Sequence, residues 1–490
     1  MRKIIKGSII FVMVLLTIGC NKDYLEPVPL TNPVDENAFD TKDRVVAQVN
    51  GMYAQVKSGA FLGGRYFVYN DIRCDNFIPK SSNLVTNYAT WNHTVLTGTN
   101  EVNNLWAAVY QAINTINLFI DGLDAAWSDG KLTGIITETE KNNYMSEALA
   151  LRAICYFDLL QLYAKPYNTG NGSNPGLPLR LVGNKSTEPN DLARSTVAQV
   201  YTQILKDLND AEPLAIEKYS TDLLNTTRIH LNTIVAFKTR VYLHMNNWAS
   251  VISEADKIVS ANAPFTASAG VGFALNPDYK ALWATPYTSK ESIFSMPFTT
   301  TNTPGTQNGL PHYYSPPSSE SYYLNTAPGY AYALMDATDV RKTMLVVSSN
   351  RNYLGKWLDF TTLTNFAPVM RYSEVLLNLS EAIVRNGNAV TQRAVDLLNA
   401  VRTRSFATGA YTIGSFTTVE SFLNAVMLER NIEFLGEGLR NMDLLRLGKT
   451  IPGKNGGSMG TVTEVTPDSP TYIWPIPGSE LTFNKLMTGN

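Results

Sequence analysis

The chain has 490 residues, and its 40 lysines and arginines nearly balance 42 aspartates and glutamates, so the net charge is −2. This balance disfavours nucleic-acid binding, because no excess positive charge is available to neutralise a phosphate backbone. A hydrophobic content of 44% excludes a disordered or collagen-like chain, while only 17% of the residues are charged. Neutral polar residues must therefore cover much of the surface, which favours uncharged polar ligands over ionic ones.

The N-terminus has the features of an export signal. Basic residues precede an apolar run over residues 9–18, which is too short to span a bilayer. The run ends at Gly19 and Cys20, a small residue before a lone cysteine, as in bacterial lipoprotein signals. We expect residues 1–19 to be removed as a signal peptide and Cys20 to be acylated, so that lipid anchors the protein to a membrane. The alternative is an ordinary secretory signal with an incidental cysteine.

Apolar side chains recur every three or four residues in many segments, which predicts helices. In chain order these segments are 105–116, 148–162, 197–208, 234–245, 252–259, 375–383, 394–401 and 425–439. Thr196 and Gln199, before the third, have the spacing of a capping box. Short turns at 246–247 and 386–388 join four of the helices into two hairpins, each the size of a tetratricopeptide unit. We predict a mainly α, tetratricopeptide-like scaffold of helix hairpins.

Four long stretches between these helices have a different composition. They are rich in Gly, Pro, Asn, Ser and Thr, and they cover residues 60–100, 166–195, 262–368 and 450–490. We predict long loops with a few short strands, such as one over residues 292–296. Loops of this length inside a compact protein usually carry function, so the functional site is expected there.

The chain shows no pattern of a catalytic or metal site. Its four histidines share no short motif with a second ligand, so we expect neither a metal nor an organic cofactor. Glu429, Glu433 and Glu437 lie four residues apart on the last predicted helix, where we expect ion pairs with Arg430, Arg440 and neighbouring helices. Three carboxylates on one helix face do not supply the opposed pair of a glycosidase, so we do not predict an enzyme.

Two cysteines remain in the chain after Cys20. Cys155 lies within the apolar stripe of a predicted helix, where cysteine behaves as a small hydrophobe. Export would permit a disulfide with Cys74, but we favour two unpaired thiols.

Aromatic residues stand out in the predicted loops. Residues 311–332 contain six tyrosines, one acidic residue and no basic residue. A tyrosine offers a flat apolar face and a hydroxyl group, which suits a sugar ring or a peptide. The residues predicted to contact a ligand are Trp91, Asn92, Trp283, Tyr287, Tyr313, Tyr314, Tyr322 and Asn325. The alternative is that these rings pack the loops onto the helices.

Several segments carry a family resemblance. Residues 370–382 read MRYSEVLLNLSEA, residues 429–449 read ERNIEFLGEGLRNMDLLRLGK, and residues 474–481 read WPIPGSEL. These segments resemble motifs of the SusD/RagB family of Bacteroidetes outer-membrane lipoproteins. The resemblance implies one helical body with an N-terminal region over residues 20–220 and a C-terminal region over residues 221–490.

The same resemblance implies a function without catalysis. Proteins of this family are surface-exposed, lipid-anchored lids on TonB-dependent outer-membrane transporters of the SusC type, to which they deliver nutrients. We therefore expect a glycan-binding protein, with a peptide-binding RagB-like protein as the alternative. The matching motifs belong to the scaffold, so the ligand site has to be inferred from the loops.

Overall fold

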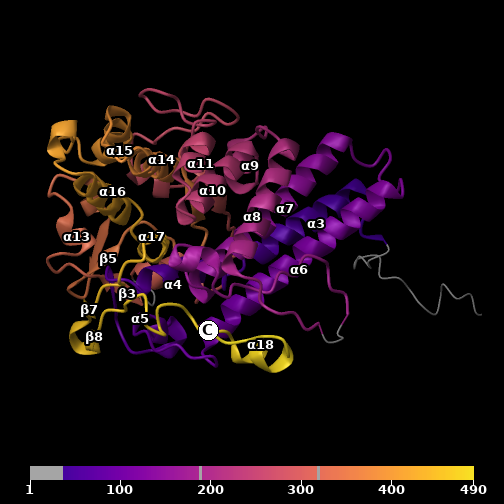
Figure 1. Cartoon of the computed structure of the whole chain (residues 1–490), viewed down its shortest axis with the longest axis horizontal. Helices are drawn as coiled ribbons and strands as arrows, with labels where there is room; N and C mark the ends of the chain where they lie inside the picture. Colours follow the sequence, from indigo (N-terminus) through magenta and orange to yellow (C-terminus); the bar gives the residue numbers. More distant parts are fainter. Residues whose placement is uncertain (1–36, 187–189, 317–320) are drawn as a thin grey trace, which may run out of the picture.

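Helices make up the body of the protein, as the apolar periodicity predicts (Figure 1). The computed structural model describes residues 37–186, 190–316 and 321–490, so the expected signal peptide and Cys20 lie outside the described part. The helices are α3 (Lys42–Val56), α4 (Arg65–Ile72), α5 (Tyr88–Trp91), α6 (Asn100–Ser128), α7 (Glu138–Tyr163), α8 (Val197–Ala211), α9 (Asp222–Thr227), α10 (Leu231–His244), α11 (Trp248–Ala255), α12 (Leu310–Tyr314), α13 (Ala331–Leu334), α14 (Tyr372–Gly387), α15 (Gln392–Ser405), α16 (Val419–Glu433), α17 (Leu439–Arg446) and α18 (Gly478–Phe483).

The long helices stack in chain order. Helix α6 contacts α3 and α7, α7 contacts α8, and α8 contacts α10 across the predicted regional boundary at residues 220–221. The two predicted hairpins form as α10–α11 and α14–α15, and they meet where α11 contacts α14. Figure 1 shows α3, α6 and α7 at one end of this stack and α14, α15 and α16 at the other. The mainly helical fold is confirmed, while the boundary at residues 220–221 stays a prediction.

Local sequence signals explain where these helices begin and what they bury. The Thr196 hydroxyl accepts from the Gln199 amide at 3.2 Å, and the Gln199 side chain accepts from the Thr196 amide at 2.8 Å, which confirms the predicted capping box of α8. The apolar stripe of α7 is buried, and Cys155 lies within it. Cys155 and Cys74 are both buried and unpaired, as predicted.

The last predicted helix, over residues 425–439, is interrupted. Helix α16 ends at Glu433 and α17 begins at Leu439, with a tight turn between them. Gly436 and Gly438 in this turn have φ of 86° and 76°, a left-handed conformation that glycine adopts without steric cost. A Cβ at position 438 would also lie 2.8 Å from the Cα of Phe67, so the turn and the packing both require glycine.

The described strands pair in four short two-stranded antiparallel sheets. These are β1 (Phe77–Pro79) with β3 (Tyr322–Leu324), β2 (Ser292–Met296) with β6 (Ala367–Arg371), β4 (Leu345–Ser348) with β5 (Arg351–Leu354), and β7 (Lys454–Asn455) with β8 (Thr461–Val462). The predicted strand over residues 292–296 is β2. Ser349 and Asn350 join β4 to β5 with φ of 50° and 59°, as in a type I′ hairpin turn.

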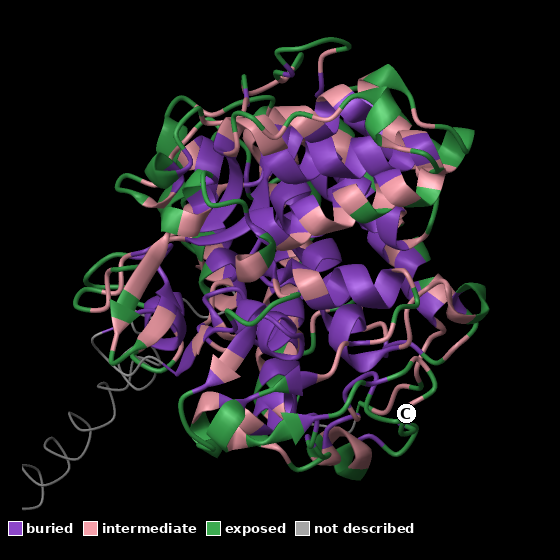
Figure 2. Cartoon of the chain, turned by 90° about the vertical axis from the view of Figure 1, so that its left-hand side faces the viewer, coloured by how far each residue is buried: buried purple, intermediate pink, exposed green. Residues whose placement is uncertain are grey.

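The β4–β5 hairpin lies at the end of the molecule that also carries β3 and α13 (Figure 1). Figure 2 looks onto this end, where exposed and half-buried segments surround a buried interior. None of the helices in the three described ranges is long and apolar enough to cross a membrane.

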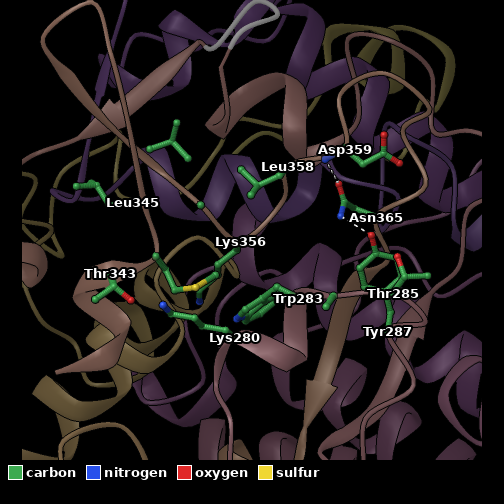
Figure 3. A pocket seen from close by; sticks show the side chains of 14 residues that line it. Lys280, Trp283, Thr285, Tyr287, Thr343, Leu345, Lys356, Leu358, Asp359 and Asn365 are labelled. Carbon is green, nitrogen blue, oxygen red and sulfur yellow. Dashed lines mark hydrogen bonds between the residues drawn. The ribbon is translucent and has the colours of Figure 1, made fainter.

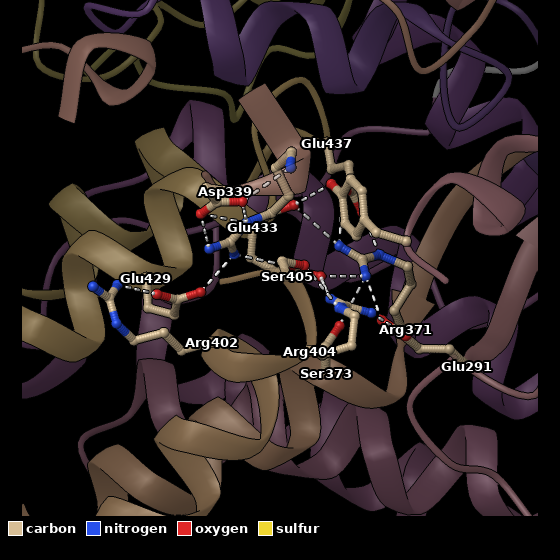
Figure 4. Close-up of polar contacts among 12 residues, drawn as sticks. Glu291, Asp339, Arg371, Ser373, Arg402, Arg404, Ser405, Glu429, Glu433 and Glu437 are labelled. Carbon is tan, nitrogen blue, oxygen red and sulfur yellow. Dashed lines mark hydrogen bonds and ion pairs between the residues drawn. The ribbon is translucent and has the colours of Figure 1, made fainter. Parts of the chain in front are cut away.

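A buried ion network joins α16 to the elements packed against it (Figure 4). Arg371, at the end of β6, lies 2.8 Å from both Glu433 and Glu437. Arg341 approaches Glu433 from another side, at 3.0 Å. Burial alone would raise the pKa of Glu433, but Arg404, Arg371 and Arg341 together lower this pKa below its ordinary value. The network therefore holds the Glu433 carboxylate ionised inside the scaffold.

The predicted ion pairs of these glutamates with neighbouring helices are confirmed, since Arg402 and Arg404 of α15 pair with Glu429 and Glu433 at 3.0 and 2.6 Å. The two partners predicted by name are wrong. Arg430 pairs with Asp443 at 2.8 Å, and Arg440 lies 3.5 Å from Asp75. The break between α16 and α17 turns Arg440 away from the glutamates. Their partners come from segments distant in the sequence, which a helical repeat cannot reveal.

Candidate functional site

Five of the eight predicted ligand-contact residues lie in the core. Trp91, Tyr313, Tyr314, Tyr322 and Asn325 expose between 0 and 3% of their surface. Their polar groups bond inside the protein: the Trp91 indole donates to a carbonyl at 2.9 Å, and the Tyr322 hydroxyl donates to another at 2.7 Å. For the four aromatic residues the ligand-contact prediction is corrected, because no ring face is open to a ligand and the rings pack the loops onto the helices. Asn325 is buried but lines the second pocket described below, so its ligand contact stays a prediction.

The other three predicted residues lie nearer the surface. Asn92 is half-buried at the end of α5 and lines neither of the pockets described below. Trp283 and Tyr287 are also half-buried, and both line a pocket beside the β4–β5 hairpin. The structure thus brings together only these two of the predicted aromatic residues.

We call this first cavity the Trp283 pocket (Figure 3). Its volume is about 680 Å³, within the range of small-molecule sites. Three segments of the chain form its walls. The lining residues are Lys280, Trp283, Ala284, Thr285, Tyr287, Thr343, Met344, Leu345, Val346, Gly355, Lys356, Leu358, Asp359 and Asn365.

Trp283 is held as a rigid platform on one wall of the pocket. It ends a short 3-10 helix over Lys280–Trp283. The Lys356 ammonium lies 4.6 Å from the centre of its ring, and the Trp357 ring meets it edge-on at 5.5 Å. Lys356 is itself fixed by Glu437 of the buried network, at 2.7 Å. The ion network thereby supports the aromatic wall of the pocket.

The opposite wall is polar and built from one connected chain of hydrogen bonds. The Asn365 amide donates to the Tyr287 hydroxyl at 2.8 Å and accepts from the Asp359 amide at 2.8 Å (Figure 3). The Asp359 carboxylate accepts from the amides of Thr362 and Thr364 at 2.9 and 3.0 Å. Burial would raise the pKa of Asp359, but these hydrogen bonds lower it overall, so the group stays ionised. Its acceptor positions are occupied by its own loop.

A second cavity, the Tyr330 pocket, lies beside the turn of the same hairpin. Its volume is about 420 Å³. Arg351 lies over the Tyr323 ring with its guanidinium carbon 4.9 Å from the ring centre. The lining residues are Ile78, Tyr323, Leu324, Asn325, Thr326, Ala327, Tyr330, Asn350, Arg351, Asn352, Asn455 and Gly457. Two tyrosines, one arginine and four asparagines make this pocket aromatic and rich in amides.

The predicted ligand contact Tyr322 is buried, whereas its neighbour Tyr323 lines the Tyr330 pocket. Tyr322 and Tyr323 both belong to β3, where Tyr322 is buried and Tyr323 is half-buried. Consecutive strand residues point to opposite faces, so one ring packs inward and the other borders the Tyr330 pocket. This alternation could have been found only once residues 322–324 were assigned to a strand.

Both pockets are equipped for binding rather than for bond breaking. They combine aromatic faces with hydroxyl and amide groups, and the lining carboxylate Asp359 is engaged by its own loop. Within residues 37–186, 190–316 and 321–490, no group of three or more His, Cys, Asp or Glu is placed to hold a metal ion. The fold is a helical scaffold whose loops line the two pockets.

Comparisons with known proteins give the family. A family model described as "Starch-binding associating with outer membrane" matches residues 23–243, and one described as "SusD family" matches residues 338–490. A SusD superfamily protein from Bacteroides fragilis is 32% identical with a TM-score of 0.81, and the match covers 92% of this chain and 99% of that one. The chain belongs to the SusD family, whose members are non-catalytic binding proteins.

Two further relatives are more distant. SusD-like protein P2 of Formosa agariphila is 25% identical, and the match covers 99% of each chain. The structure of a laminarin-binding SusD-like protein is 18% identical with a TM-score of 0.72, over 92% of this chain and 99% of that one, and shows the shared fold. The mainly helical fold expected from the sequence motifs is therefore the SusD fold.

Proposed function

We propose that this protein captures oligosaccharides at the Trp283 pocket and delivers them to a TonB-dependent outer-membrane transporter of the SusC type. The observation that carries the proposal is a pocket of about 680 Å³ with a rigidly held indole on one wall and a polar wall opposite. The starch-binding description of the matching family model and the laminarin-binding relative support a carbohydrate ligand.

The pocket chemistry matches the two surfaces of a sugar ring. An apolar sugar face can stack on Trp283, and stacking contacts of this kind contribute about 0.5–1.5 kcal/mol each beyond the buried area. Hydroxyl groups can exchange hydrogen bonds with Thr285 and Thr343, which line the pocket and are exposed. One or two rings plus such contacts give a dissociation constant on the order of micromolar to millimolar.

A peptide is the second candidate ligand, and one observation favours it. Strand β4 pairs only with β5 in the described sheets, and Leu345 and Val346 of β4 line the Trp283 pocket. An extended peptide could add to this edge through main-chain hydrogen bonds. Titration calorimetry with purified protein against neutral and acidic oligosaccharides and a set of peptides separates the two candidates. Binding of peptides alone would contradict the carbohydrate proposal.

We also propose that the protein is anchored at the outer membrane through acylated Cys20. The family model supports an association with the outer membrane, and the junction at Gly19 and Cys20 supports the lipid. Cys20→Ala should abolish labelling by a fatty-acid analogue and release the protein from membranes. Cys74→Ala, which changes a buried and unpaired thiol, is the matched control and should keep the label. Labelling that persists in Cys20→Ala would contradict the anchor.

A further inference from the structure

We propose that the preferred oligosaccharide carries an acidic group, a carboxylate or a sulfate ester, because each pocket beside the β4–β5 hairpin presents a cation that no protein carboxylate pairs with. The inference rests on the proposed carbohydrate-binding function and narrows the class of its ligand. It concerns Lys280 in the Trp283 pocket and Arg351 in the Tyr330 pocket.

Lys280 is an exposed member of the Trp283 pocket wall. Its ammonium forms no hydrogen bond or ion pair within the part of the chain that the structure describes. In Figure 3 the side chain extends toward Thr343, beside the Trp283 ring. A sugar stacked on Trp283 would therefore present its substituents to an ammonium, which suits an anionic oxygen, while the Thr343 hydroxyl already donates to the Val340 carbonyl at 2.7 Å.

None of the other charged groups that line the Trp283 pocket forms an ion pair with Lys280. The Asp359 carboxylate accepts from the Thr362 and Thr364 amides and from their hydroxyl groups. Lys356 is buried and pairs with Glu437 at 2.7 Å, so its charge is already balanced. Lys280 is therefore a lining cation of this pocket that no carboxylate of the described residues pairs with.

The Tyr330 pocket also presents a cation without a carboxylate partner, and it does so independently of the first pocket. Its lining contains Arg351 and no aspartate or glutamate. The half-buried Arg351 stacks on Tyr323 and has no ion pair among the described residues, which leaves its planar fork of donors free for a carboxylate or sulfate. The side chains of Asn350 and Asn352 beside it also form no hydrogen bond in the described ranges, so amides for neutral hydroxyl groups are at hand.

The two unpaired pocket cations are a local feature that the charge of the whole chain does not reveal. The net charge of −2 gives no general attraction for anions, so the preference has to come from the two pockets. Lys280 borders one pocket of the hairpin and Arg351 the other, so an oligosaccharide with repeated acidic units could engage both cations at once. The composition favours uncharged ligands, whereas the two cations without ion pairs favour acidic ones.

The experiment compares acidic oligosaccharides with neutralised forms of themselves. The probes are uronic-acid oligosaccharides and their methyl esters, sulfated oligosaccharides and their desulfated forms, and neutral gluco-oligosaccharides, all titrated into the full mature protein. We expect the tightest binder to be acidic, and to bind at least about fivefold more tightly than its neutralised form at 50 mM salt. The ratio should shrink toward one at 500 mM salt, because exposed ion pairs are screened.

Two variants locate the effect. Lys280→Met and Arg351→Met should each lower the affinity for the acidic probe several-fold more than the affinity for its neutralised form. Lys206→Met is the matched control, since it removes an exposed lysine of α8 that pairs with Asp210. If the tightest binder is neutral, and its affinity is independent of salt and unchanged in both variants, the inference is overturned while the proposed function stands. If no oligosaccharide of any class binds, the proposed function falls and this inference with it.

Discussion

Two regions of the molecule use the same residue types in opposite ways. In the network behind β6, Arg371 is 3% exposed and lies 2.8 Å from Glu433 and Glu437. Beside the β4–β5 hairpin, Lys280 and Arg351 border open pockets and form no ion pair in the described ranges. A buried cation is stable in the fold only when carboxylates pair with it. A solvent-exposed cation without such a partner can instead bind an anionic group of a ligand.

The tyrosines of residues 311–332 also divide into buried rings with polar partners and half-buried rings without them. Tyr314 is fully buried and its hydroxyl donates to Asp71 at 3.2 Å. Tyr323 and Tyr330 are half-buried, and their hydroxyl groups form no hydrogen bond within the described ranges. Aromatic density in a loop therefore does not by itself indicate a binding surface. Burial and polar partners decide which ring belongs to the scaffold.

The largest expected effect comes from breaking the buried network. Arg371→Met should lower the free energy of unfolding by about 3–5 kcal/mol, because it leaves Glu433 and Glu437 buried with fewer cationic partners. The midpoint of urea unfolding measures this, with Lys206→Met as a surface control expected to shift stability by less than about 0.5 kcal/mol. An unchanged midpoint for Arg371→Met would show that the network does not hold the scaffold.

A matched pair of tyrosine variants tests the division of the aromatic segment. Tyr314→Ala should destabilise the protein by about 3–5 kcal/mol, because it removes a large buried ring. Tyr330→Ala should change stability by less than about 0.5 kcal/mol and weaken oligosaccharide binding. Thermal unfolding and calorimetry measure both properties. Loss of affinity in a stable Tyr314→Ala protein would reverse the assignment.

A third prediction concerns the stability of the protein at acidic pH. Burial would raise the pKa of Glu381, but Arg446, at 2.7 Å, and Arg385 lower it to about 2. Because the folded pKa lies below the unfolded value of about 4.5, this stabilisation is complete above pH 4.5 and is lost as the pH falls toward 2. The loss is about 3 kcal/mol at 1.36 kcal/mol per pKa unit.

Unfolding curves between pH 5 and pH 2.5 check this prediction. The slope of stability against pH in that window should be smaller in Glu381→Gln than in the native protein, because one titrating group is gone. Equal slopes in the two proteins would contradict a role of Glu381 in acid unfolding.

The smallest change in free energy is expected for a variant of the Trp283 pocket. Trp283→Ala should weaken oligosaccharide binding by about 0.5–1.5 kcal/mol, which corresponds to roughly two- to twelvefold. Trp248→Ala is the matched control, since Trp248 is also half-buried and has Arg385 over its ring at 5.1 Å, but lies on α11 away from both pockets. Equal affinities in the two variants would remove Trp283 from the site.

The sequence predicts the scaffold much better than the site. Apolar periodicity places the helix hairpins because each helix buries one face, and the Thr196 capping box marks a start that the structure reproduces. The end of α16 is missed because the stripe continues through Gly436 and Gly438, whose backbone conformation breaks the helix.

The site residues depend on packing between segments far apart in the chain. Whether Trp91 or Trp283 faces a pocket is decided by neighbours such as Phe77 and Lys356, which no local pattern reveals. Tyr287 lines the Trp283 pocket, and its contact with a ligand stays a prediction. The neighbouring rings Tyr322 and Tyr323 can be told apart only from the register of β3.

A crystal structure of the protein with its tightest-binding oligosaccharide tests the central claim most directly. We expect a sugar ring stacked on Trp283 or held between Tyr323 and Tyr330, with an acidic group within hydrogen-bonding distance of Lys280 or Arg351. An oligosaccharide bound elsewhere, for example in the groove lined by Phe39 and Phe119, with both hairpin pockets empty, would contradict the account.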